Sequence, residues 1–349
     1  MSTYTMLGPE GLGPYRVIWG ATGPNLTPAT RAAPHYLVPG FVDLHIHGAF
    51  GIDFMTADLA HTAHLADLLW NVGYEGFLPT TVTGSAADVS KAVANLPAHR
   101  SVLGFHLEGP FISPSFPGAQ PAEKIVTPPV GPSEWDPILE HPSLRLVTLA
   151  PEIPRGLELA TRLLKRGVRV NMGHTNATYE EARRGYEFGV SGSTHTYNAM
   201  RGLHHREAGA LGYLLRNDDL FAEIIYDRIH VCRDAADLLF KVKPSSRVVA
   251  VSDGTMASGL EPGTKLNMWG IDVVVGVGDV RLASNQALAG SAITLADAFR
   301  NLAQDFGPEV AIRLCCLNPR SYLGMKDPPR RWLELNKEFQ VIGSRELRN

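Results

Sequence analysis

The sequence has few cysteines, little net charge and no long apolar run, and each absence excludes a class of protein. Its three cysteines are Cys232, Cys315 and Cys316, an adjacent pair and one left over. That is no disulfide framework, so a reducing, cytoplasmic environment is expected. No stretch approaches the length of about 18 apolar residues that a membrane span needs, and no basic segment followed by an apolar one opens the chain. We therefore expect neither a membrane helix nor a secretory leader.

The charged residues nearly cancel. Lys and Arg total 32 against 35 for Asp and Glu, which gives a formal net charge of −3. Such a balance predicts no nucleic-acid partner and no binding to an anionic membrane. The 349 residues, 44% of them hydrophobic, suffice for one large α/β domain with an appendage, or for two domains.

From about residue 40, short apolar runs alternate with longer helical patterns. Strands are expected at residues 41–47, 75–81, 101–108, 144–151, 168–174, 191–198, 222–227 and 247–253. Helix start signals such as Ser85 and Thr178, and stop signals such as Gly167, bound the helices between them. Eight strand–helix repeats predict an α/β fold whose parallel sheet closes into a (β/α)8 TIM-like barrel. The alternative is an open doubly wound sheet, but its fingerprint G-x-G-x-x-G does not follow the first strand.

Three regions fall outside this alternation. Residues 111–140 are rich in Pro and Gly and form a long insertion after the third strand, of a length typical of functional or disordered loops. Residues 255–290 follow the eighth strand and are expected to contain a β-hairpin flap. Residues 1–40 and 325–349 are expected to form a small β-sandwich subdomain, beside a barrel of residues 41–324.

Ionisable residues gather where the expected strands end. They are His45 and His47 on the first strand, Glu108 on the third, His174 on the fifth, His195 on the sixth and Asp253 on the eighth. In a (β/α)8 barrel these ends meet at one mouth, where such folds place their active sites. Residues far apart in the sequence would therefore lie together.

The residue types at these positions suit a metal ion. A period of two places Asp43, His45 and His47 on one strand face, where the two histidines either bind metal or only form hydrogen bonds. Glu108 ends an apolar strand, and a buried carboxylate is costly unless it has a partner. Imidazoles and carboxylates are ligands of zinc and similar divalent ions, so a metal would supply that partner.

Asp253, in the segment VVAVSDGTM, adds a second carboxylate to this set. A carboxylate beside a metal site can accept a proton from an attacking water and pass it to a leaving group. A divalent ion lowers the pKa of a bound water to about 7, which makes it a nucleophile at neutral pH. The set therefore predicts metal-assisted hydrolysis, with an N-cap of the following segment as the alternative role for Asp253.

The segments PGFVDLHIHG, HLEGPF, GHTNAT, THTYNAM and VSDG, in this order, resemble the amidohydrolase superfamily and, within it, the N-acetylglucosamine-6-phosphate deacetylases. The similarity covers about residues 38–300. In many other amidohydrolases a carboxylated lysine at the end of the fourth strand is the bridging ligand. Here that strand ends in Ala150-Pro151-Glu152, and the carboxylate comes from Glu108 on the third strand instead.

The resemblance implies a role for each matching residue. Glu108, His174 and His195 would hold the main divalent metal, His45 and His47 would hold a second, and Asp253 would be general base and then general acid. Zinc is the expected metal, and iron, cobalt and manganese are alternatives. The implied substrate-binding residues are Ala119, Gln120, Asn198, Ala199, Arg206, Asp227, His230, Leu288, Ala289 and Gly290. Arg206 would bind a phosphate through its guanidinium fork, or else form only a surface salt bridge.

The activity implied by the resemblance is hydrolysis of the N-acetyl group of N-acetylglucosamine 6-phosphate in amino-sugar catabolism, by a homodimer. The alternatives are an amidohydrolase for another N-acyl amino sugar or an N-acyl amino acid, and a non-catalytic sugar-phosphate sensor. Two departures leave the exact sugar open: Gln120 stands where the family usually has histidine, and Arg228 where it often has glycine. The C-terminal segment also lacks the family's usual acidic-apolar strand.

Overall fold

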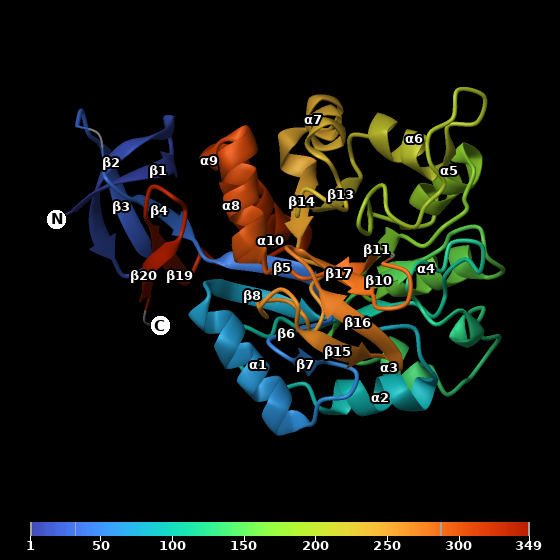
Figure 1. The fold of residues 1–349 in the computed structure, drawn as a ribbon. Coiled ribbons are helices and arrows are strands. Elements are labelled where there is room, and N and C mark those ends of the chain that lie inside the picture. The colour runs from blue at the N-terminus through green and yellow to red at the C-terminus, as the bar shows by residue number, and fades with distance from the viewer. Residues whose placement is uncertain (1, 32, 287, 348–349) are drawn as a thin grey trace.

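The computed structural model describes residues 2–31, 33–286 and 288–347, and its centre is a set of parallel strands (Figure 1). β5 (Phe41–Ile46) pairs with β8 (Tyr74–Pro79). The other parallel strands form one sheet in the order β14-β13-β12-β11-β10-β9. Their bounds are β9 (Phe105–Glu108), β10 (Leu144–Leu149), β11 (Arg169–Met172), β12 (Gly192–Ser193), β13 (Phe221–Ile225) and β14 (Val248–Val251). Each lies within the range expected from the sequence or within one residue of it, which confirms the parallel α/β architecture.

Isolated backbone bridges link these two sheets, so that the parallel strands curl. Phe77 and Thr80, in and just after β8, bridge in parallel to Val102 and His106, before and in β9. On the other side, Ile46 of β5 bridges to Gly254, which follows β14. The last strand therefore approaches the first.

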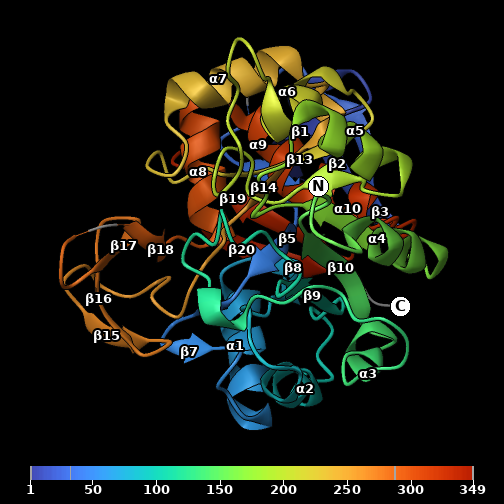
Figure 2. The ribbon, with the colours of Figure 1, turned by 90° about the vertical axis from the view of Figure 1, so that its right-hand side faces the viewer.

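Helices surround the curled sheet (Figure 2). They are α1 (Leu59–Asn71), α2 (Ala86–Ala94), α3 (Asp136–Leu139), α4 (Gly156–Lys165), α5 (Tyr179–Glu187), α6 (Gly209–Arg216), α7 (Arg233–Val242), α8 (Leu295–Phe306), α9 (Pro308–Ile312) and α10 (Asn318–Tyr322). Capping boxes begin α2 at Ser85 and α5 at Thr178, as predicted. Gly167 follows α4 with φ +74°, a left-handed conformation that ends a helix and that glycine adopts without strain. Among the described residues, no helix is both long and apolar enough to cross a lipid bilayer.

The strands are buried on both faces, as expected for parallel strands that are covered by helices. Side chains from five strands meet in one inner cluster that contains Val42, Leu44, Leu78, Leu146, Ile225, Val249 and Val251. The interior near the strand ends is left to polar residues such as His45, His106 and Glu108, all fully or almost fully buried.

Both termini join one mixed, six-stranded sheet in the order β20-β19-β4-β1-β2-β3 (Figure 1). The strands are β1 (Ser2–Gly8), β2 (Gly11–Gly20), β3 (Gly23–Pro28), β4 (Tyr36–Pro39), β19 (Arg331–Leu335) and β20 (Val341–Glu346). The sheet has its own small core of Met6, Tyr15, Val17 and Leu37. Residues 1, 32, 348 and 349 of the predicted terminal subdomain lie outside the described residues.

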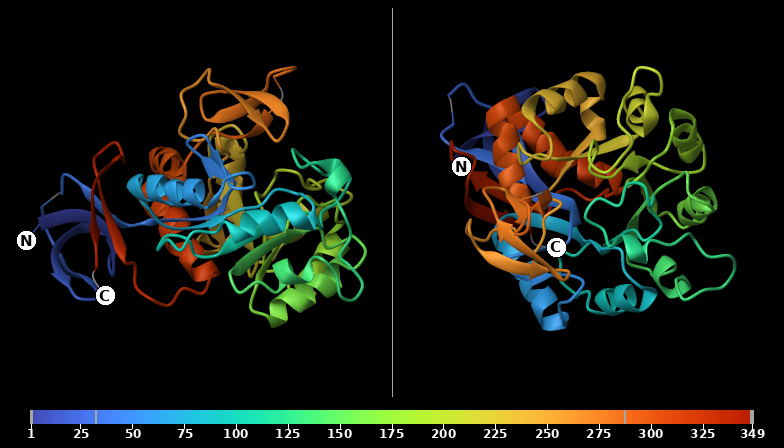
Figure 3. Two further views of the ribbon diagram at one scale, coloured as in Figure 1. Left: turned by 90° about the horizontal axis from the view of Figure 1, so that it is seen from below. Right: turned by 45° about the vertical axis from the view of Figure 1, so that its right-hand side comes forward.

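The segment after β14 forms more than the predicted hairpin. It is a four-stranded antiparallel sheet, here called the flap: β15 (Lys265–Met268), β16 (Ile271–Val275), β17 (Asp279–Leu282) and β18 (Leu288–Ser291). The flap stands out from the rest of the molecule as a separate lobe (Figure 3). Its own apolar cluster, which includes Met268, Val273 and Val280, explains why extra strands are needed: a lone hairpin could not enclose it.

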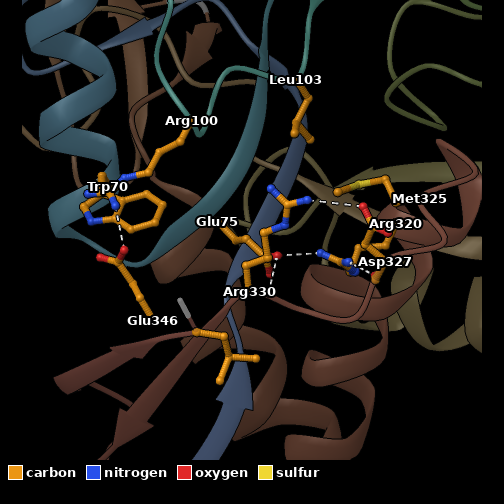
Figure 4. A pocket seen from close by; sticks show the side chains of 10 residues that line it. Trp70, Glu75, Arg100, Leu103, Arg320, Met325, Asp327, Arg330 and Glu346 are labelled. Atoms are coloured by element: carbon orange, nitrogen blue, oxygen red, sulfur yellow. Dashed lines mark hydrogen bonds and ion pairs between the residues drawn. The ribbon is translucent and has the colours of Figure 1, made fainter. Parts of the chain in front are cut away.

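A cavity of about 430 Å3 lies at the start of the parallel strands, where they meet the terminal sheet (Figure 4). Its charged groups are already paired. Arg320 binds Glu75 at 2.7 Å with both side chains buried, and Arg100 binds Glu346 of β20 at 2.6 Å. Arg100 also stacks on Trp70, 4.1 Å from its ring centre. We interpret this region as the contact between the parallel strands and the six-stranded terminal sheet.

Candidate metal centre and catalytic cavity

Six ionisable side chains converge where the parallel strands end. His45 lies in β5, His47 just after it, and Glu108 at the end of β9. The other three each lie two residues beyond a strand: His174 after β11, His195 after β12 and Asp253 after β14. The structure thus brings together all the metal-ligand and general-base candidates from the sequence. They fall into two groups whose ligand atoms lie close together: Glu108 with His174 and His195, and His45 with His47 and Asp253.

Three of these residues sit at strained backbone positions. His174, His195 and Asp253 have φ values of +46°, +30° and +45°, in a region that residues with a Cβ rarely adopt. In each case the chain has just left a strand, and the unusual φ turns the side chain into the space enclosed by the strand ends. Such strain costs of order 1–3 kcal/mol per residue and is concentrated at functional sites.

The first group is compact. Oε1 of Glu108 lies 3.1 Å from Nε2 of His174 and 3.1 Å from Nε2 of His195, and these two nitrogens are 3.1 Å apart. Nδ1 of His174 faces the carbonyl oxygen of Phe116 at 3.0 Å, which places a proton on Nδ1 and leaves the lone pair on Nε2. Two imidazole nitrogens and a carboxylate oxygen thus point at one spot.

The second group adjoins the first through the other oxygen of Glu108. Nε2 of His45 and Nε2 of His47 are 3.1 Å apart and lie 3.2 and 3.3 Å from Oδ1 of Asp253. Oε2 of Glu108 is 3.2 Å from His47 and 3.5 Å from His45. Nδ1 of His47 faces the backbone carbonyl of Thr80, and a contact of the same kind orients His174. Glu108 therefore has one oxygen in each group.

This donor set fits divalent metal. Burial lowers the pKa of His47, but hydrogen bonds to Asp253 and Glu108 outweigh it and raise that pKa to about 9. Burial raises the pKa of Glu108, yet the charge of His45 and hydrogen bonds from His174 and His195 hold it well below its usual range. The site thus stabilises positive charge between ionised carboxylates, and N/O ligands of this kind suit zinc.

His45 and His47 lie side by side, but not through the regular alternation predicted for β5. The pairing of β5 with β8 shifts register between Asp43 and Ile46. Asp43 accepts hydrogen bonds from the hydroxyl of Tyr74 and the backbone of Ser252, away from the two imidazoles. The prediction that Asp43 shares their face is therefore wrong, because the strand is irregular at that point.

Gly109 explains the break that follows Glu108 in the sequence. Its φ is +67°, and a Cβ at this position would lie 2.1 Å from Oγ1 of Thr83. A cis peptide bond joins Gly109 to Pro110. Only glycine lets the chain turn this tightly directly after the ligand.

A cavity of about 200 Å3 opens onto both groups. The expected substrate-binding residues that line it are Ala119, Gln120, Asn198, Ala199, His230, Leu288, Ala289 and Gly290. Asp227 stands behind it and accepts a hydrogen bond from Nδ1 of His230 at 2.5 Å. Arg206 does not line the cavity; it lies exposed on a loop, near the ring of His205.

Gln120 contacts Glu108, one of the candidate metal ligands. Its Nε2 donates to Oε2 of Glu108 at 2.6 Å, and its Oε1 accepts from the backbone N–H of Thr83 at 2.7 Å. The amide therefore bridges the loop after β9, the segment after β8 and the carboxylate. It orients Glu108 directly.

Arg228 points away from the cavity. It carries φ +70°, and its guanidinium binds the carboxylate of Asp305 on α8 at 2.7 and 2.9 Å. The left-handed backbone explains why glycine is usual at this position in the family. Arg228 adopts the left-handed backbone conformation that glycine would adopt, and its side chain points away from the cavity.

Three residues near the cavity were missed by the sequence reasoning. Glu223 of β13 is buried and accepts hydrogen bonds from Asn171 and from the backbone N–H of His195. Trp269, at the β15–β16 turn, meets the ring of His47 edge-on at 5.9 Å and donates to buried Asp53 at 2.9 Å. For Glu223 the only signal in the sequence was a carboxylate inside the apolar run AEIIYD. A carboxylate in an apolar strand also singled out Glu108.

Comparison with known proteins is consistent with this site. The amidohydrolase family model matches residues 36–328. N-acetylglucosamine-6-phosphate deacetylase of Lysinibacillus sphaericus is 35% identical over 77% of this chain and 71% of its own. N-acetylgalactosamine-6-phosphate deacetylase of Escherichia coli O157:H7 is 33% identical over 85% of this chain and 80% of its own. The crystal structure of N-acetylglucosamine-6-phosphate deacetylase from Thermotoga maritima, 29% identical, superposes with a TM-score of 0.89 over 99% of this chain and 98% of its own.

Proposed function

The chain belongs to the amidohydrolase family, and we propose that it hydrolyses N-acetylglucosamine 6-phosphate to glucosamine 6-phosphate and acetate in amino-sugar catabolism. The observation that carries the proposal is the position of Glu108, whose two oxygens face two separate groups of buried ligands at the floor of one cavity. That arrangement suits metal-assisted attack on an amide, and relatives that are similar to this chain over most of their own length are named for this reaction.

Glu108, His174 and His195 would hold the main divalent metal, and His45 with His47 would hold a second. Zinc suits these ligands best, and iron, cobalt or manganese could replace it. When bound, such an ion polarises the amide carbonyl and lowers the pKa of water.

Asp253 would move the proton. Its Oδ1 lies within 3.3 Å of both His45 and His47, and its side chain lines the cavity. Burial raises the pKa of Asp253, but the two imidazoles outweigh this and hold it well below its usual range, so the carboxylate is ionised and carries no proton of its own. The water oxygen bonds to the acyl carbon, the C–N bond breaks, and Asp253 passes the proton to the amine nitrogen.

The remaining cavity residues would bind the sugar. Asn198 and His230 offer polar groups for its hydroxyls and amide, and Asp227 orients His230. Ala119, Gln120, Ala199 and the Leu288-Ala289-Gly290 segment of the flap close around it. Arg206 would bind the phosphate, although it lies on an exposed loop outside the cavity. A homodimer in the reducing cytoplasm is proposed from the family resemblance and from the three free cysteines.

We also infer that the two parallel sheets form one closed (β/α)8 barrel of residues 41–324. The bridges from β8 to β9 and from β5 to the end of β14 support this closure. Residues 1–40 and 325–349 would form the small subdomain, with the terminal sheet curled into a sandwich around Met6, Tyr15, Val17 and Leu37.

A second candidate substrate is N-acetylgalactosamine 6-phosphate. The Escherichia coli O157:H7 relative named for it is as similar to this chain as the glucosamine enzymes are.

The test is acetate release from both phosphosugars and from unphosphorylated N-acetylglucosamine, after chelation and after adding back zinc, iron, cobalt or manganese. We expect turnover of N-acetylglucosamine 6-phosphate that is lost on chelation and restored by metal. Faster turnover of the galactosamine substrate would favour the second candidate. Metal-dependent turnover of none would overturn both.

A further inference from the structure

A second cavity adjoins the catalytic one, between the flap and the loop after β9. Its volume is about 480 Å3, against about 200 Å3 for the catalytic cavity. The two cavities share six lining residues: Gly118, Ala119, Gln120, Trp269, Leu288 and Ala289. Because Trp269 also contacts His47, the second cavity begins beside the metal centre. A ligand held at the metal centre could therefore extend into it.

Most side chains that line this second cavity are apolar, although polar atoms also face it. Seven residues line the second cavity but not the catalytic cavity: Pro121, Ala122 and Glu123 of the loop, and Met268, Ile271, Val273 and Leu282 of the flap. Six of these seven are apolar, and no Lys, Arg or His is among the described residues that line it. Ile271 is 47% exposed and Leu288 is 40% exposed, so apolar surface faces water beside the catalytic cavity.

The side chains that line the two cavities differ, and this difference assigns the two halves of the substrate. Asn198, His230 and Asp253 line only the catalytic cavity, and they offer hydrogen bonds to sugar hydroxyls and to the amide. In the second cavity the sugar hydroxyls would face mostly apolar side chains, and a phosphate would face Glu123 with no Lys, Arg or His among the described lining residues to pair with it. The hydrocarbon half of the substrate, its acyl chain, is the part that matches.

We propose that this acyl groove, formed by residues 118–123 and the flap residues Met268, Trp269, Ile271, Val273, Leu282, Leu288 and Ala289, binds N-acyl chains longer than acetyl. The inference rests on the proposed function and widens its substrate class to N-acylated hexosamine 6-phosphates with chains of about four carbons. For the butyryl compound, water oxygen bonds to the acyl carbon and the C–N bond breaks. A water proton passes to the amine, which gives butanoate and glucosamine 6-phosphate.

The test compares kcat/KM for N-acetylglucosamine 6-phosphate and N-butyrylglucosamine 6-phosphate with the metal-loaded full chain. Each fully buried methylene strengthens binding by about fourfold, so two give at most about fifteenfold. Because the groove is partly open, we expect a butyryl-to-acetyl ratio between one and about fifteen. A ratio below one, with rapid acetyl turnover, would overturn the acyl groove and leave the proposed function intact. Turnover of neither compound would overturn both.

Two variants in the flap test where the acyl chain of the substrate binds. Ile271→Ser removes an apolar side chain from the groove wall and should lower the butyryl-to-acetyl ratio about fourfold or more. Val277→Ser is the matched control: Val277 is 82% exposed on the β16–β17 turn and lines neither cavity, so the ratio should stay as in the wild type. An unchanged ratio in Ile271→Ser would show that the acyl chain binds elsewhere and would refute the proposal.

Discussion

Replacing Gln120 by alanine should weaken metal binding without removing any proposed metal ligand. The amide of Gln120 donates to Oε2 of Glu108 at 2.6 Å, while its oxygen accepts from the backbone N–H of Thr83 at 2.7 Å. Glu108 is almost wholly buried, so the carboxylate oxygen cannot recruit bulk water when the amide is removed. Oε2 would keep only its contacts with His45 and His47, so the carboxylate would be held less firmly in its present orientation.

The size of the effect follows from the kind of bond that is lost. A hydrogen bond to a charged group contributes about 1.5–3 kcal/mol, and about 1.4 kcal/mol corresponds to tenfold in an equilibrium constant. Mutations of residues that orient metal ligands typically cost about 10- to 100-fold in metal affinity. Both routes give the same expectation, an increase of about ten- to a hundredfold in the dissociation constant for zinc of Gln120→Ala.

The assay is competition for zinc between the metal-free protein and a chromogenic chelator, with circular dichroism to show that the variant is folded. Lys124→Ala is the control, because Lys124 lies in the same loop, is exposed and lines neither cavity. Its zinc affinity should match the wild type. If Gln120→Ala binds zinc within twofold of the wild type, the amide does not orient Glu108 and the reasoning fails.

Three further predictions follow from single residues. Asp253→Asn should keep metal at the Glu108 group but lose about 10^2- to 10^4-fold in kcat, and full activity in a variant of normal metal content would exclude a proton-transfer role. Arg228→Gly should leave KM within about threefold and change the free energy of urea unfolding by less than about 1 kcal/mol, because the lost exposed pair with Asp305 is offset by relief of the positive φ; a tenfold rise in KM would place the arginine at the substrate. Burial lowers the pKa of Lys243 to about 8, so the unfolded chain binds more protons between pH 8 and its ordinary value of 10.5 and this lysine makes stability rise with pH across that window. Lys243→Met should lose this rise, as measured by urea midpoints at pH 7.5 and 9.5, and an unchanged pH dependence would refute the assignment.

The parallel strands and the positions of the candidate ligands could be predicted because both depend on short-range patterns. Apolar runs of four to eight residues between capped helices locate the strands, and parallel strands all end at the same edge. His45, Glu108 and His195 are separated by many residues in the chain, yet the topology alone places them together. Helix boundaries were equally accessible, since the capping box at Thr178 is local chemistry.

Features that depend on long-range geometry could not be predicted in this way. The register shift in β5 arises where β5 pairs with β8, so the strand's own sequence could not separate Asp43 from His45. Nothing local marks Glu223 as the acceptor for the backbone of His195, since that contact joins β13 to the turn after β12. The flap was expected as one hairpin because the sequence shows strand propensity but not how many strands are needed to enclose an apolar cluster.

The two departures from the family pattern change how the site is held rather than what it can do. Arg228 adopts the left-handed backbone that glycine would supply and pairs with Asp305 outside the cavity, so it neither narrows the sugar site nor adds charge to it. Gln120 donates an N–H to Glu108, as a neutral histidine could, but its amide cannot gain or lose a proton at neutral pH. Its hold on Glu108 is therefore independent of pH, whereas that of a histidine would change as its ring titrates. The residue that seemed to place the substrate in doubt thus has a defined role at the proposed metal ligand, and sugar specificity is better sought in His230, Asn198 and the flap, which line the cavity.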